Sequence, residues 1–109
     1  MPMLQKVALA LALMAPLAWA TPTPAVATDY VVVIEKMKFG PAPDNLHVGD
    51  VIVWQNKDIL RHTATARDKS FDVDLPPGAE AKTTVGQAGS FAFFCRFHPG
   101  MTGTLNVSP

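Results

Sequence analysis

Short runs of alternating hydrophobic and polar residues fill most of the chain after residue 30. A period of two is typical of β-strands that bury one face. Residues that favour turns separate the runs, and no stretch of ten or more residues has a helical period, which excludes parallel β/α folds. The pattern predicts an all-β sandwich or barrel of about seven or eight strands. The predicted strands are 30–35, 45–50, 51–56, 62–66, 70–75, 80–85, 90–95 and 102–107.

The first predicted strand contains a change of register. Val32 and Ile34 share one face, whereas Met37 and Phe39 have the opposite parity. Both pairs reach a single core only if the strand is bulged near residues 35–36, so we expect a β-bulge there.

Two later strands have clear faces. In "SFAFFC", Phe91, Phe93 and Cys95 share one side, so core rings would place the thiol inward at the end of the strand. The strand "VIVWQN" has Val51, Val53 and Gln55 on one face and Ile52, Trp54 and Asn56 on the other.

The first 29 residues differ from the rest. A lysine at position 6, an apolar run and the sequence Ala18-Trp19-Ala20 predict a secretory signal peptide over residues 1–20, with cleavage after Ala27 as the alternative. The run is too short for a membrane span and contains Pro16. Residues 21–29 read as a flexible tether. Residues 30–109 would then form one exported domain, in a bacterial periplasm, with no stable membrane insertion.

Charge is balanced along the chain. Nine basic and nine acidic residues give a formal net charge of zero, and the two signs are interspersed. Nucleic-acid binding needs a basic patch, so we expect none. We interpret Asp68, Asp72 and Asp74 as scattered solvated charge rather than as a patch that steers a partner.

Cys95 is the single cysteine of a chain predicted to be exported, so it cannot form an internal disulfide. His98 and Met101 follow it at intervals of three residues, and one loop can gather a thiolate, an imidazole and a thioether. A buried inert thiol and a methionine that fills the core are the alternatives. The conjunction of these donors at a strand end favours a metal site.

A second nitrogen ligand has two candidates. His47 lies on a short strand without another donor nearby, and we expect it at the surface. His62 begins a strand after a polar loop and can meet the Cys95 loop at one rim of a sandwich, so we choose His62. Two imidazoles, a thiolate and a weak thioether suit copper in both oxidation states, whereas zinc prefers closed tetrahedral ligation without a thioether.

The sequence resembles the cupredoxins, the type 1 blue copper proteins, over about Val31 to Val107. The resemblance rests on "GDVIVWQNKD" followed by "HT", and on "GSFAFFCRFHPGMTGTLNV". Its Cys-x-x-His-x-x-Met loop has the short spacing typical of amicyanin-like members. The resemblance implies a Greek-key β-sandwich of two sheets and ligation of one copper ion by His62, Cys95, His98 and Met101. It also implies one-electron transfer through an exposed His98, near which redox proteins dock transiently, and we expect a monomer.

Three residues are expected around the ligands. Thr63 stands where many cupredoxins have asparagine, and its N–H can still bond the thiolate or tie the ligand loops together. Phe97 stands where related loops often have proline; if its N–H reaches Cys95, replacing Phe97 with proline lowers the reduction potential. Asn56 is the third residue.

Three functions are compatible with these patterns. We expect an electron carrier rather than an enzyme, because four donors saturate the one apparent metal site and no acid–base constellation accompanies it. A periplasmic copper chaperone or copper-buffering protein is the second function. A metal-free adhesion module with a buried cysteine is the third.

Overall fold

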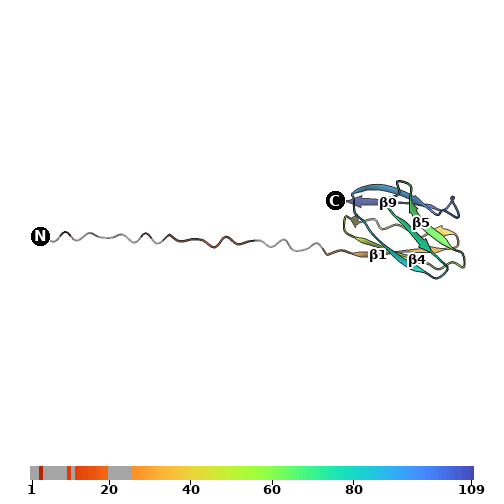
Figure 1. Cartoon of the computed structure of the whole chain (residues 1–109), viewed down its shortest axis with the longest axis horizontal. Helices are drawn as coiled ribbons and strands as arrows, with labels where there is room; N and C mark the ends of the chain where they lie inside the picture. Colours follow the sequence, from red (N-terminus) through yellow and green to blue (C-terminus); the bar gives the residue numbers. More distant parts are fainter. Residues whose placement is uncertain (1–2, 4–9, 11, 20–25) are drawn as a thin grey trace.

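Nine β-strands form two packed sheets in this computed structural model, which describes Met3, Ala10, residues 12–19 and residues 26–109. One sheet has the order β2-β1-β4-β7 and the other β3-β9-β8-β5-β6. Figure 1 labels β1 and β4 of the first sheet and β5 and β9 of the second. The predicted all-β sandwich is confirmed. The strands are β1 Asp29–Glu35, β2 Lys38–Phe39, β3 Leu46–His47, β4 Val51–Asn56, β5 His62–Ala66, β6 Asp72–Leu75, β7 Glu80–Thr84, β8 Gly89–Phe94 and β9 Thr102–Ser108.

The predicted leader and tether fall largely outside this description. Residues 1–2, 4–9, 11 and 20–25 lie outside the described residues, so the signal peptide, the tether and the cleavage position stay predictions. Within the part of the chain that is described, no helix has the length and apolar character needed to cross a membrane.

The predicted bulge near residues 35–36 is wrong, because the chain reverses there. Lys36 and Met37 have φ values of 51° and 61°, and β1 pairs antiparallel with β2 around them. Positive φ at both central residues is the geometry of a type I′ hairpin turn. The reversal places Phe39 directly opposite Ile34, so both face one core while Met37 lies in the turn. The structure therefore has one more short strand than the alternation predicts.

An aromatic cluster joins the two sheets. The ring centroids of Trp54 and Phe93 lie 5.2 Å apart, and those of Phe39 and Phe93 lie 4.8 Å apart, all edge to face. Trp54 donates its indole N–H to Thr83 Oγ1 at 3.0 Å, so its polar atom is satisfied. The cluster fixes the spacing of β4 against β8, the strand that leads into Cys95.

The register of β5 against β8 sets the place of the candidate ligands. The two strands are antiparallel, with Thr65 opposite Phe94. The start of one strand therefore lies beside the end of the other. His62 opens β5 and Cys95 follows β8, so the sheet itself brings both to one rim.

Gly103 on β9 lies against the outer end of the Phe93 ring, and a Cβ there would overlap three ring carbons. We expect Gly103→Ala to lower the free energy of unfolding by about 1–3 kcal/mol, because the ring must move within a packed core. Gly86→Ala is the matched control, since a Cβ there meets no heavy atom within 4 Å. Urea unfolding of both variants checks this; equal stability of the two would contradict the packing argument.

Asp50 anchors the start of β1. Its carboxylate accepts the N–H of Thr28 at 3.0 Å and that of His47 at 2.8 Å, and Asp50 itself is 6% exposed. These two hydrogen bonds, the one from Thr28 foremost, hold the pKa of Asp50 below its ordinary value. The ionised carboxylate thus stabilises the fold above its unfolded pKa of about 3.9.

This contribution is lost as the pH falls through the folded pKa of Asp50. We expect Asp50→Asn to be less stable than the wild type at pH 7, and the difference to shrink progressively below about pH 4. Urea unfolding of both proteins across pH 2.5 to 7 measures it. A difference that stays constant over this range would show that the carboxylate charge has no such role.

Candidate metal centre

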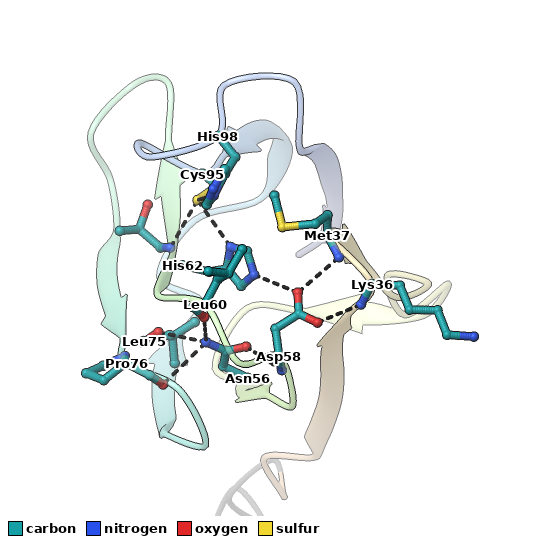
Figure 2. Close-up of polar contacts among 11 residues, drawn as sticks. Lys36, Met37, Asn56, Asp58, Leu60, His62, Leu75, Pro76, Cys95 and His98 are labelled. Atoms are coloured by element: carbon teal, nitrogen blue, oxygen red, sulfur yellow. Dashed lines mark hydrogen bonds and ion pairs between the residues drawn. The ribbon is translucent and has the colours of Figure 1, made fainter.

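Three side chains converge at the rim where β5 begins and β8 ends. Potential ligand atoms of His62, Cys95 and His98 all lie within 4.8 Å of one another. The Cys95 Sγ is 3.7 Å from Nδ1 of His62 and 3.7 Å from Nδ1 of His98 (Figure 2). His62 and Cys95 are fully buried, whereas His98 is partly exposed. The structure brings together three of the four residues chosen from the sequence through atoms that can bind one ion.

The fourth, Met101, belongs to the same loop and is 6% exposed. Three backbone hydrogen bonds fold this loop: His98 N–H to Cys95 O at 3.3 Å, Met101 N–H to His98 O at 2.8 Å, and Cys95 N–H to Met101 O at 3.1 Å. The loop therefore closes on itself, with Met101 returning beside the residue that follows β8. This closure gives His98 and Met101 fixed backbone positions before any ion binds.

The outer nitrogen of His62 is held by a carboxylate. His62 Nε2 lies 2.7 Å from Asp58 Oδ2. An ionised carboxylate only accepts, so Nε2 carries a proton, and in the neutral imidazole Nδ1 keeps a free lone pair. That lone pair belongs to the nitrogen nearest Cys95 Sγ. The contact thus selects the tautomer that a metal site requires.

Asp58 also supports the β1–β2 turn. Its carboxylate accepts the N–H of Lys36 at 2.8 Å and that of Met37 at 3.0 Å. The bond from Met37 and then the bond with His62 hold the pKa of Asp58 below its ordinary value. Asp58 was not predicted from the sequence. Its position four residues before His62 was the available signal. A loop has no regular period, however, so this spacing does not predict that the two side chains meet.

Thr63 contacts the Cys95 sulfur. Its N–H donates to Cys95 Sγ at 3.4 Å, and its hydroxyl oxygen accepts the N–H of Arg96 at 2.9 Å. The residue therefore ties β5 to the loop through both backbone and side chain.

Asn56 supports the loop before His62 and has no hydrogen bond to His62, Cys95 or His98 in the described part of the chain. It is 1% exposed, and its Nδ2 donates to the carbonyls of Leu60 and Leu75 at 2.8 and 2.9 Å. Its Oδ1 accepts the Asp58 N–H at 2.9 Å. Asn56 thus fixes the loop that carries Asp58 and leads to His62.

Phe97 does not act as the expected donor. In the described part of the chain, no hydrogen bond joins the Phe97 N–H to Cys95 Sγ; Thr63 supplies the N–H instead. The Phe97 ring is 49% exposed and lies 5.5 Å from the Arg61 guanidinium and 5.8 Å from that of Arg96. The premise for expecting proline at this position to lower the reduction potential is therefore absent.

His47 takes no part in the cluster. It is exposed, and its Nδ1 lies 3.1 Å from the carbonyl oxygen of Asn45. His62, and not His47, lies with Cys95 and His98.

The donor set fits a soft ion with nitrogen and sulfur ligands. Such ligands bind at about 2.0–2.3 Å, so two atoms on one ion lie at most about 4.6 Å apart. Both sulfur–nitrogen distances of 3.7 Å satisfy this limit. This set matches the preferences of copper: two imidazoles, one thiolate, and a buried thioether on the loop that carries the thiolate.

Known proteins share this fold and sequence pattern. The sequence profile of the cupredoxin-like domain matches residues 7–107. Amicyanin from Paracoccus versutus is 30% identical over 89 residues, which cover 75% of this chain and 67% of that protein. The crystal structure of amicyanin from the same organism has a TM-score of 0.63 at 28% identity, covering 80% of this chain and 86% of that one.

A copper-containing nitrite reductase from Thermus scotoductus SA-01 has a TM-score of 0.66 at 22% identity. The match covers 77% of this chain and 23% of that one. At this identity the likeness concerns the fold alone.

The contact between Asp58 and His62 yields a prediction about metal binding. We expect Asp58→Ala to weaken copper binding about 10- to 100-fold, because His62 loses the partner that fixes its tautomer and ring orientation. Asp44→Ala is the charge-matched control, since Asp44 is exposed and distant in sequence from the site. A competition titration with a chelator measures both affinities. Equal affinities for the two variants would contradict a supporting role for Asp58.

Proposed function

The chain belongs to the cupredoxin-like family, and we propose that it carries single electrons between redox proteins. The site binds one copper ion, which when bound supplies the Cu(I)/Cu(II) couple. We assign His62, Cys95, His98 and Met101 as its ligands. The observation that carries the proposal is the convergence of two imidazole Nδ1 atoms on one buried cysteine sulfur at 3.7 Å each.

The protein holds these donors ready with little need for rearrangement. Asp58 fixes the His62 tautomer, and Thr63 donates its N–H to the sulfur. The backbone bonds of the 95–101 loop hold the other two ligands. A site built before binding suits electron transfer, because groups that are already oriented need not reorganise when charge changes.

Electrons would leave through His98, the partly exposed imidazole. Exposed apolar side chains lie on the two loops that carry the histidine ligands: Ile59, Leu60 and Phe97 are 90%, 46% and 49% exposed. The contact of Arg61 with Phe97 joins these loops at the rim. A small apolar surface of this kind supports brief docking of a redox protein, because transient complexes need only small interfaces. We propose that the chain acts as a monomer.

A carrier fits this site better than an enzyme does. Four donors from the protein complete the coordination that copper prefers, which leaves no position for a substrate. The likeness to a nitrite reductase is a likeness of fold, and it covers a minor part of that longer chain.

Export to a bacterial periplasm is also part of the proposal. It is supported by the basic start, the apolar run and the small residues before position 21. Mass spectrometry of the protein recovered from a periplasmic fraction should give a chain that starts at Thr21, or at Thr28 if the alternative site is used. A full-length chain in the cytoplasm would contradict export.

Copper loading tests the carrier function. We expect the mature protein loaded with Cu(II) to show the intense visible absorption of a copper–thiolate site, and Cys95→Ser to abolish it, because the thiolate is the ligand responsible. His47→Ala is the control and should keep the band. Cyclic voltammetry of the wild type should be reversible, and self-exchange fast.

Two results would count against the carrier. Stoichiometric transfer of copper to an apo-acceptor, together with slow or irreversible redox cycling, would identify a copper-delivery protein instead. A colourless wild type that binds zinc more tightly than copper would overturn the ligand assignment.

A further inference from the structure

A closed ring of hydrogen bonds lies beside the metal centre and reaches the surface. Arg96 N–H donates to Thr63 Oγ1 at 2.9 Å, and the Thr63 and Thr65 hydroxyl oxygens are 2.9 Å apart. Thr65 Oγ1 donates to Asp72 Oδ1 at 2.7 Å, and Arg96 Nε returns to the same carboxylate oxygen at 3.3 Å. The ring therefore joins β5, β6 and the residue directly after Cys95.

The direction of each bond follows from its ends. The Asp72 carboxylate only accepts when ionised, so the Thr65 hydroxyl donates its hydrogen bond to Asp72. Its oxygen can then accept from Thr63, whose hydroxyl proton points toward Thr65. This leaves the Thr63 oxygen free to accept the N–H of Arg96. Each bond polarises the next, so the exposed carboxylate strengthens the bond that holds the buried loop.

Burial makes this order necessary. Thr63 is 0% exposed and Thr65 is 8% exposed, whereas the Asp72 and Arg96 side chains are 50% and 45% exposed. A hydroxyl proton buried without an acceptor is costly. The strand pairing places Thr65 directly opposite Asp72, so the acceptor is built into the sheet.

Thr63 links the ring to the sulfur. The same residue that accepts the Arg96 N–H through its side chain donates its own N–H to Cys95 Sγ. Holding Arg96 against Thr63 therefore holds Cys95 against the Thr63 N–H. An N–H bond to the sulfur draws electron density from it and favours the reduced form of a copper–thiolate site.

We propose that Thr65 and Asp72 are positioning residues for the metal centre, acting through Thr63 to fix the Cys95 sulfur and raise the reduction potential. The effect on the reduction potential rests on the proposed copper function. The effect on the position of Cys95 does not require copper and has its own measurement.

The first experiment uses the copper-free protein. We expect Thr65→Val to speed hydrogen exchange of the Arg96 amide about threefold to tenfold, because Thr63 loses its acceptor and holds Arg96 less firmly. Thr65→Ser keeps the hydroxyl and should keep the wild-type exchange rate. NMR exchange measurements on the three proteins compare them residue by residue.

The second experiment measures the reduction potential of the copper-loaded proteins. Thr65→Val should shift the Cu(I)/Cu(II) affinity ratio about threefold to tenfold toward Cu(II), which lowers the potential by about 30–60 mV for one electron. Thr65→Ser should restore the wild-type potential. A purely structural role for Thr65 would change stability without this shift.

A second pair of variants covers failure of Thr65→Val to fold. Asp72 and Asp74 lie two residues apart on β6, have 50% and 42% exposed side chains, and each pairs with an arginine. Asp72→Ala removes the acceptor and should therefore speed Arg96 amide exchange, whereas Asp74→Ala, with the same change of charge, should leave it unchanged.

The outcomes separate the two proposals. Unchanged Arg96 exchange in both Thr65→Val and Asp72→Ala would overturn the positioning role, whatever the metal does. Altered exchange with an unchanged potential would confine the ring to loop stability and overturn its tuning role. Absence of copper binding by the wild type would overturn the proposed function and with it the tuning role, while the exchange data still decide the positioning.

Discussion

The Asp58 carboxylate joins the β1–β2 turn to His62 at the candidate metal centre. It accepts two backbone N–H groups from the β1–β2 turn and the Nε2–H of His62. The turn residues Lys36 and Met37 both have positive φ, which side chains with a Cβ adopt at a cost. Hydrogen bonds to one anion offset that cost, and the same anion fixes the imidazole. The unfavourable turn and the proposed ligand His62 therefore depend on the same interaction.

The other three proposed ligands depend on different contacts. Cys95 is placed by β8, which the aromatic contact of Phe93 with Trp54 fixes against the opposite sheet. His98 and Met101 follow in a loop closed by its own backbone hydrogen bonds. His62 and Cys95 lie on two strands of one sheet that packs against the other, and such residues cannot shift easily, because packed sheets do not deform continuously. That rigidity suits one-electron chemistry, in which the two oxidation states must share one set of ligand positions.

Alternation along the chain was sufficient to predict the faces of the long strands. Trp54, Phe93 and Cys95 are buried as the period of two requires. The end of the strand before Cys95 and the start of the strand at His62 indicated where the candidate site lies. The hairpin turn at residues 36–37 was not predictable, because neither residue is one that favours positive φ. Its stability comes from Asp58, which is 21 or 22 residues away along the chain. Interactions of that separation leave no local pattern in a single sequence.

Threonine at position 63, where many cupredoxins have asparagine, has a physical consequence that the sequence alone does not reveal. An asparagine side chain, as many cupredoxins have there, separates its accepting oxygen from its two N–H donors. A threonine hydroxyl accepts and donates at one atom, and at 0% exposure its proton needs an acceptor. The Thr65 hydroxyl oxygen accepts this hydrogen bond and donates its own to Asp72, so the three residues form one functional unit. Replacing an amide by a hydroxyl beside the sulfur thus extends the environment of the metal centre to a carboxylate at the surface. Asp72, read from the sequence as solvated charge, takes its role from the residue type at position 63.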